Sequence, residues 1–236
     1  MLFLLPNLLD ESLDHKLFLP QSVDSAASKL DGLIAESDKA ARRFLKRFQT
    51  KKILQEMPVK LLNEHTQDSE LYELLEPIKK GECWGLISDA GLPCIADPGS
   101  KLVRLAHLQH IAVEAFVGPS SLILALMLSG FSGQRFSFHG YLPKEEKERN
   151  RQLKLLEEDA KRFGRTHIFI EAPYRSHTLL AELVATLQDD TNLCVAWDLT
   201  LPTQGVISQS LREWKKGTLP ELQKKPAIFL FAGKNQ

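Results

Sequence analysis

The stretch SDAGLPCIADPG, residues 88–99, decides how the first half of this chain folds. It follows a short apolar run, Cys83 to Ile87, which predicts a buried strand of a parallel sheet because such strands read as continuous apolar runs. The loop then lies at the strand's carboxyl end, where open α/β sheets bind their ligands. Its glycines allow a positive φ and its prolines stiffen the remainder. The same residues also suit a tight strand-to-helix connection without a ligand, so both interpretations stay open.

Apolar runs and helical segments alternate along the first half of the chain, and this order is typical of a parallel α/β sheet. Short apolar runs predict strands at 2–5, 33–35, 83–87 and 111–116. Apolar residues at helical spacing predict helices at 38–48, 68–80 and 98–107.

The second half keeps the α/β theme with more antiparallel character. Predicted strands lie at 136–141, 166–170, 192–197, 204–208 and 227–231, and predicted helices at 144–162 and 177–187. Between the halves, residues 119–128 predict a helix that is apolar on every side and therefore buried. The pattern changes at Val117, so we expect two α/β domains, 1–116 with a parallel sheet and 117–236 with a mixed sheet.

Balanced charge and sparse cysteines limit the sites that this chain can carry. Its 30 basic and 30 acidic residues cancel. This balance argues against a positive potential over the whole surface that would attract nucleic acid, but it leaves room for a local basic patch. The three cysteines lie far apart without metal-ligand spacing, so we expect no metal site and no disulfide. The apolar N-terminus lacks a basic segment, and the longest apolar stretch, 122–128, is too short to cross a bilayer. These features predict a cytoplasmic protein without membrane contact.

Positive charge gathers on one face of the predicted helix 38–48 and just beyond it. Apolar side chains recur on the opposite face, as in an amphipathic surface helix. The cations that we consider for an RNA contact are Arg42, Arg43, Lys46 and Arg47. A solvated face explains such a row, and so does a patch that contacts phosphates, because neighbouring cations repel one another unless an anion is near.

A second glycine-containing turn precedes the predicted helix 119–128. Gly118 permits the close approach of a ligand, and Ser120 and Ser121 stand in the first helical turn, where backbone N–H groups lack intrahelical partners. The segment predicts a ligand-binding turn, with a buried core helix as the alternative.

Four stretches taken together carry a resemblance to a known family. They are SDAGLPCIADPG at 88–99, VGPSSLILALMLSGF at 117–131, FSFHGYLP at 136–143 and IFIEAPYR at 168–175. In this order and spacing, over nearly its whole length, the chain resembles the tetrapyrrole methylase superfamily. It is most similar to the branch that methylates the ribose 2′-hydroxyl of small-subunit ribosomal RNA, and to bacterial relatives of that branch.

The resemblance implies a methyltransferase that uses S-adenosylmethionine, bound in a cleft between two α/β domains, and a homodimer. The implied substrate is RNA of the small ribosomal subunit. Carried over position by position, the implied cofactor-binding residues are Pro6, Asp89, Ala90, Leu92, Pro93, Ser120, Ser121, Ile170, Glu171, Leu199 and Ala227.

Three segments depart from that branch. The first loop, LLPNLLDE at 4–11, lacks the glycine that the ribosomal enzymes carry there. ESDK at 36–39 stands in place of an acidic pair followed by Thr-Arg, and WDLTL at 197–201 stands in place of Arg-Glu-Leu-Thr-Lys. The cofactor side is therefore better matched than the substrate side.

A ribose hydroxyl is a poor nucleophile at neutral pH, so that substrate calls for a general base. Glu36 is the first candidate, because it ends a predicted strand at the ligand-binding edge and keeps the family's acid, and Asp89 is the second. Two other functions stay open. One is methylation of a small molecule such as a tetrapyrrole, or of a protein side chain; the other is cofactor or RNA binding without catalysis.

Overall fold

The computed structural model describes residues 1–234. The chain divides into a first unit, Met1–Ser120, and a second unit that begins at Ser121. Residues 117–120 thus belong with the first unit, although the sequence analysis assigns them to the second domain. The reason is close packing: a Cβ added to Gly118 would lie 2.0 Å from the Cβ of Pro6, so the turn fits tightly against the first loop.

Five parallel strands form the sheet of the first unit, in the order β3-β2-β4-β1-β5. The strands are β1 (Leu2–Leu4), β2 (Gly32–Ala35), β3 (Val59–Leu61), β4 (Trp84–Leu86) and β5 (Val113–Ala115). The parallel sheet is confirmed. The sequence analysis misses β3, because a lysine separates Val59 from Leu61 and no apolar run results.

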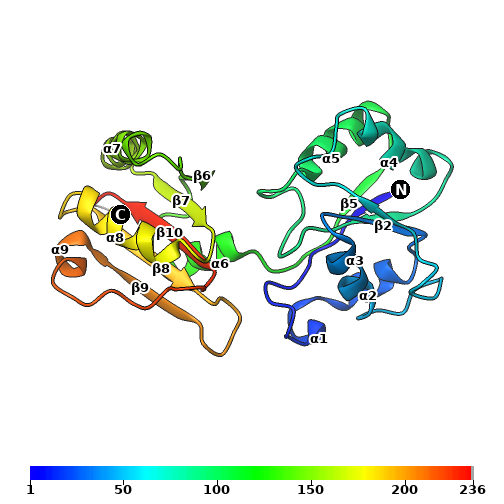
Figure 1. The fold of residues 1–236 in the computed structure, drawn as a ribbon, viewed down its shortest axis with the longest axis horizontal. Helices are drawn as coiled ribbons and strands as arrows, with labels where there is room; N and C mark the ends of the chain where they lie inside the picture. The colour runs from blue at the N-terminus through cyan, green and yellow to red at the C-terminus, as the bar shows by residue number, and fades with distance from the viewer. Residues whose placement is uncertain (235–236) are drawn as a thin grey trace. The chain divides into compact units, whose positions relative to one another are not determined.

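Helices cover both faces of this sheet. They are α1 (His15–Phe18), α2 (Gln21–Ala27), α3 (Asp38–Leu45), α4 (Glu70–Lys79) and α5 (Gly99–Leu108). Successive strand residues point to opposite faces, so Leu33 packs in the core with α2 and α3, whereas Ile34 packs in the core with α4 and α5. Figure 1 shows these two helix pairs on opposite sides of the strands.

The second unit holds a mixed sheet, as the sequence analysis predicts, and its strand order is β6-β7-β10-β8-β9. β6 (Phe136–Tyr141) and β7 (Thr166–Glu171) run parallel. β10 (Ala227–Ala232) pairs antiparallel with β7 and β8 (Asn192–Trp197), and β9 (Gly205–Ser210) pairs antiparallel with β8. The helices are α6 (Ser121–Ser129), α7 (Glu146–Phe163), α8 (Ser176–Thr186) and α9 (Leu211–Trp214).

Helix α6 is less buried than its composition predicts. It packs against β8, β9 and β10, and Ala125 and Leu126 are buried. Met127 and Leu128, in contrast, are 72% and 40% exposed. The expectation of a helix buried on every side is wrong for this face, because the sheet covers one side of α6 only.

Among the described residues, no helix combines the length and apolar composition needed to cross a lipid bilayer. Within residues 1–234, His, Cys, Asp and Glu side chains also form no group of three or more that is suited to a metal ion.

Candidate active site

The loop that follows β4 is joined to the loops of both neighbouring strands. On one side, the backbone N–H of Asp89 donates to Oε1 of Glu36, directly after β2, over 3.1 Å. On the other side, the N–H of Asn7, in the loop after β1, donates to the carbonyl oxygen of Gly91 over 2.7 Å. Parallel strands bring their carboxyl ends to one edge, and there the structure brings together Glu36 and Asp89, the two acids singled out from the sequence.

Asn7 is the central hydrogen-bonding residue of this edge, and the sequence analysis misses it. The side chain is buried, with 5% exposed. Nδ2 donates to the carbonyl oxygens of Ser88 (3.0 Å) and Asp89 (3.1 Å). Oδ1 accepts from the N–H of Leu8 (2.9 Å) and from Nη1 of Arg47 (3.1 Å). An amide side chain placed just after a buried strand at the ligand-binding edge is the signal that would have found it.

Glu36 lies in an environment that favours its protonated form. Burial is the main cause that raises the pKa of this carboxyl, and the negative charges of Asp89 and Asp97 raise it further. The hydrogen bond from the Asp89 N–H acts in the opposite direction. A carboxylate with a raised pKa accepts a proton more readily, as a general base requires.

The second part of the loop holds two residues in an unfavourable backbone conformation. Cys94 and Ala96 adopt φ values of 70° and 64°, in the left-handed region that non-glycine residues avoid. Oδ1 of Asp97 accepts from the N–H of Gly99 at 2.7 Å, whereas its Oδ2 is buried without a partner among the described residues. Such strain costs about 1–3 kcal/mol per residue and clusters at ligand sites. Since neither strained residue is a glycine, the sequence gives no sign of it.

The turn at 117–120 lies against the same edge. Pro6 is buried and packs on Gly118. Gly91 has a φ of 72°, and a Cβ at this position would lie 3.4 Å from the carbonyl oxygen of Pro119. The loops that carry Pro6, Asp89 and Ser120 are therefore neighbours within the first unit.

Comparison with known proteins identifies the family. The model of the Tetrapyrrole (Corrin/Porphyrin) Methylases matches residues 23–215. The chain belongs to the tetrapyrrole methylase family. Among its curated relatives is the "Ribosomal RNA small subunit methyltransferase I" of Thermotoga maritima, which is 31% identical over 192 residues, 80% of this chain and 82% of the relative. Relatives of the same name occur in Pasteurella multocida (31% identical; 87% of this chain, 71% of the relative) and Haemophilus influenzae (32% identical; 79% of this chain, 64% of the relative).

Solved structures of methyltransferase fold also align with most of the chain. Diphthine synthase gives a TM-score of 0.60 at 15% identity and covers 98% of this chain and 89% of its own. The uroporphyrin-III C-methyltransferase of Thermus thermophilus, complexed with S-adenosylhomocysteine, gives 0.52 at 14% identity, with 98% and 96% covered. At these identities the likeness shows the fold. Membership of the family makes this chain a methyltransferase with S-adenosylmethionine as its methyl donor.

The edge of the first sheet fits such a donor chemically. S-Adenosylmethionine supplies a methyl group on a positively charged sulfur. Glu36, Asp89 and Asp97 bring three carboxylates close enough for the last two to raise the pKa of the first. A cationic ligand would offset the repulsion among these carboxylates.

In the second unit, the residues expected at a tetrapyrrole methylase cofactor site lie at one end of three adjacent strands. Glu171 of β7 pairs with Ala227 of β10, which in turn pairs with Trp197 of β8. Ile170 precedes Glu171, and Leu199, which is buried, follows shortly after β8. The structure thus brings Ile170, Glu171, Leu199 and Ala227 into one region of this unit.

Glu171 already has a charged partner. Its Oε1 accepts from Nη2 of Arg175 at 2.6 Å and from the N–H of Ala172 at 2.7 Å. Arg175 is therefore engaged in an ion pair within the second unit. The pKa of Arg175 is raised because its guanidinium donates to Glu171.

Asp198 and Thr200, beside Leu199, are further strained positions that the sequence analysis misses. Their φ values are 49° and 76°. The Thr200 hydroxyl oxygen is buried and has no hydrogen-bond partner within the described chain. By the same reasoning as for the Asp89 loop, this turn is a candidate ligand contact.

The four cations considered for RNA have different surroundings. Arg42 donates to the carbonyl oxygens of Leu54 (2.6 Å) and Met57 (3.0 Å), so it holds the segment that leads to β3. Arg43 pairs with Glu11, and both line a pocket of about 210 Å³ with Arg47. Lys46 is exposed. The structure therefore gives Arg42 a structural role, whereas Arg43 and Arg47 line this pocket and Lys46 is exposed.

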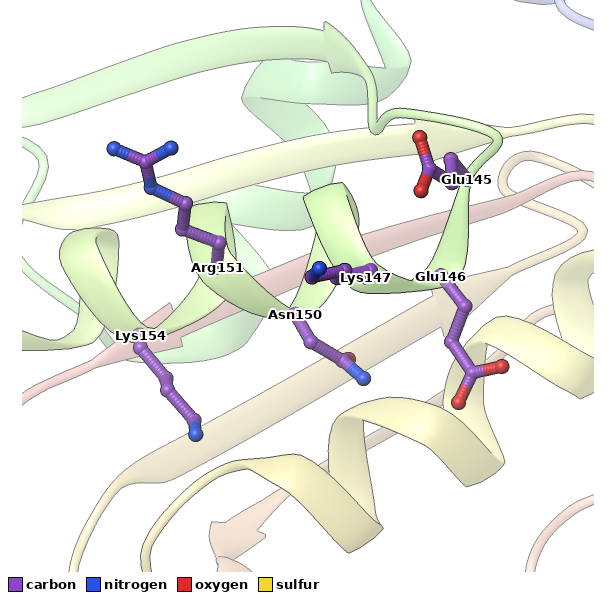
Figure 2. Close-up of a pocket in the computed structure, with 6 residues that line it drawn as sticks. All are labelled: Glu145, Glu146, Lys147, Asn150, Arg151 and Lys154. Atoms are coloured by element: carbon purple, nitrogen blue, oxygen red, sulfur yellow. The ribbon is translucent and has the colours of Figure 1, made fainter.

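A larger hollow, of about 740 Å³, lies on the surface of α7 in the second unit. Its lining comes from α7 and the residue before it: Glu145, Glu146, Lys147, Asn150, Arg151 and Lys154. Figure 2 shows that Arg151 and Lys154 point away from one another. Polar groups that do not converge make a poor binding site, so we assign this hollow no role in catalysis.

Proposed function

We propose that this chain transfers the methyl group of S-adenosylmethionine to the 2′-hydroxyl of a ribose in small-subunit ribosomal RNA. The observation that carries the proposal is the match to relatives named for small-subunit ribosomal RNA methylation, at 31% identity over 80% of the chain. The choice of the ribose hydroxyl follows from the resemblance of the four sequence motifs to the branch that modifies this atom.

The proposed cofactor-binding residues come from both units. The first unit contributes Pro6, Asp89, Ala90, Leu92, Pro93 and Ser120, and the second contributes Ser121, Ile170, Glu171, Leu199 and Ala227. Two observations support the assignment: the loops of Pro6, Asp89 and Gly118 are neighbours, and Glu171 pairs with Ala227. Methyl transfer from sulfur is an in-line displacement, so holding the reactants in line is the protein's main task, worth up to about 7–11 kcal/mol.

Glu36 is the proposed general base, which removes the proton of the ribose hydroxyl. Its raised pKa supports this role, and the Asp89 N–H orients the carboxylate. A positioned base contributes about a hundredfold to ten-thousandfold in rate.

Arg43, Lys46 and Arg47 are the proposed phosphate contacts of the RNA, and Arg42 is too firmly bound to backbone carbonyls to share in them. The proposal predicts RNA affinity that falls steeply with salt, because neutralised phosphates release their counterions.

The proposal includes a homodimer in the cytoplasm. The resemblance to the family supports the dimer, and the exposed Met127 and Leu128 of α6 offer an apolar surface for a second copy. A ribosomal substrate supports the location. Sedimentation of the wild type and of Met127→Asp tests the dimer, which the added charge should weaken.

Incubation of the purified protein with methyl-labelled S-adenosylmethionine and immature small ribosomal subunits tests the proposed function. We expect label in the RNA, loss of at least a hundredfold in rate for Glu36→Gln, and a normal rate for Glu56→Gln, an exposed acid of the same unit. Label in ribosomal protein, or no label on any ribosomal component, contradicts the proposal.

A further inference from the structure

We propose that Asn7 and Arg47 are positioning residues for the cofactor loop: Arg47 fixes the orientation of the Asn7 amide, and that amide holds the backbone at Ser88 and Asp89. This assigns Arg47 a task at the cofactor loop in addition to the phosphate contact proposed above. The inference rests on the proposed function only through the role of Asp89 at the cofactor, and it does not depend on the nature of the methyl acceptor.

All hydrogen-bonding positions of the Asn7 amide are used. Both Nδ2 hydrogens go to carbonyl oxygens, those of Ser88 and Asp89, and Oδ1 accepts two hydrogen bonds, from Leu8 and Arg47. A side-chain amide has two donor hydrogens and two acceptor lone pairs, so none is left over. The rotated amide would set donors against donors and acceptors against acceptors, which makes the observed orientation the favourable one.

This arrangement fixes the backbone of Asp89 from two sides. Its N–H donates to Glu36 and its carbonyl oxygen accepts from Asn7. The peptide group before Asp89 is held as well, through the carbonyl oxygen of Ser88. The main chain thus fixes the position of the Asp89 Cβ, and with it the region that the exposed carboxylate can reach.

Arg47 occupies an unusual position for a residue that serves only as an RNA contact. Burial, followed by the nearby charge of Arg43, lowers the pKa of Arg47. Its backbone N–H bonds to the carbonyl oxygen of Phe44 just past the end of α3, and this turn directs the guanidinium toward Asn7. An exposed side chain such as Lys46 meets phosphates without the cost of burial.

Binding of S-adenosylmethionine and S-adenosylhomocysteine, measured by calorimetry without RNA, tests the inference. Arg47→Met removes the guanidinium but retains a side chain of similar length. We expect the Kd of both ligands to rise about threefold to tenfold, the effect of one hydrogen bond. Asn7→Asp keeps the acceptor oxygens and loses both donors, so its Kd should rise by about tenfold to a hundredfold.

Two further variants separate positioning from a general loss of stability. Arg47→Lys restores a cationic donor, and we expect it to recover most of the lost affinity. Arg104→Met removes an exposed arginine of α5, and we expect wild-type binding. Thermal unfolding of each variant is recorded in parallel. If Asn7→Asp does not fold, the comparison of Arg47→Met with Arg47→Lys tests the inference by itself.

The inference is overturned if Arg47→Met binds both ligands with the Kd of the wild type. This holds even if the variant has a lower Tm or a lower affinity for RNA. A wild type that binds neither ligand overturns it together with the cofactor role of Asp89. A wild type that binds S-adenosylmethionine but methylates no ribosomal RNA contradicts the proposed substrate only, and the calorimetric comparison then stands by itself.

Discussion

The backbone N–H of Asp89 donates to Oε1 of Glu36 over 3.1 Å, and this bond connects the proposed cofactor loop to the proposed general base. The two residues follow β4 and β2, which are adjacent strands of the parallel sheet. Because such strands end at one edge, the fold brings together two groups that are more than fifty residues apart in the sequence. The proposed cofactor loop and the proposed general base are thereby placed on neighbouring loops.

The raised pKa of Glu36 predicts a pH dependence of methyl transfer. The base must be deprotonated, so kcat/KM should fall with decreasing pH below a pKa higher than the ordinary 4.5 of a glutamic acid. Glu36→Gln should also unfold at a slightly higher temperature than the wild type, because it removes a half-buried charge whose deprotonation opposes folding. The pH dependence of kcat/KM and the unfolding temperature of both proteins are measured from about pH 5 to about pH 8. A Glu36→Gln variant that keeps the wild-type rate and the same fall in rate at low pH would refute the assignment.

A positive charge at position 89 is expected to abolish cofactor binding. Asp89→Lys places an ammonium group where we propose that a carboxylate faces a ligand with a sulfonium, and like charges repel. The residue is exposed, so the substitution should leave the Tm nearly unchanged. Calorimetry with S-adenosylmethionine should show a loss of affinity of at least a hundredfold, and retained micromolar binding would move the site away from this loop.

Arg42 is expected to contribute to stability rather than to RNA binding. Arg42→Met leaves the carbonyl oxygens of Leu54 and Met57 without their donor and should lower the free energy of unfolding by about 1–3 kcal/mol. Lys46→Met, one turn further along, should change it by less than about 0.5 kcal/mol because Lys46 is exposed. Urea unfolding gives both values, and equal effects would argue against the structural role of Arg42.

His167 is expected to make the second unit sensitive to acid. This histidine of β7 is 1% exposed, and its Nδ1 lies 2.8 Å from Nε2 of His139 while its Nε2 lies 3.1 Å from a carboxylate oxygen of Asp159. Burial, followed by the charge of His139, lowers the pKa of His167 to about 4, and Arg165 acts in the same direction while Asp159 opposes it.

The unfolded chain therefore binds a proton between pH 6.5 and about 4 that the folded chain does not bind. The stabilisation is fully present above pH 6.5 and is lost as the pH falls toward 4, by up to about 3 kcal/mol. Urea unfolding at several pH values should show a smaller loss for His167→Gln. His65→Gln, at an exposed histidine, should behave as the wild type, and identical slopes for all three proteins would exclude this explanation.

The sequence predicts the features of this fold that depend on order and periodicity. Alternating strands and helices predict a parallel sheet, and parallel strands put the loops after β2 and β4 at one edge, so Glu36 and Asp89 could be singled out. The family motifs add the expectation of a cofactor loop. The predictions of the parallel sheet and of the cofactor loop both rest on local sequence patterns, which can be recognised without knowing the tertiary contacts.

The sequence does not predict the features that arise from packing between distant segments. Arg42 is part of an apparently regular row of cations, and only the position of residues 54–57 shows that its guanidinium is used inside the unit. Asn7 resembles an ordinary turn residue until the Ser88 and Asp89 carbonyls are brought beside it. The strained φ of Cys94 equally has no local signature, because the surrounding loop imposes it.

Alkaline hydrolysis of the labelled RNA product tests the central claim most directly. A methyl group on a ribose 2′-oxygen prevents that oxygen from attacking the adjacent phosphate, so the label should be recovered in an alkali-resistant dinucleotide from small-subunit RNA. Label recovered in mononucleotides would place the methyl group on a base, and the account of a ribose hydroxyl activated by Glu36 would then be wrong.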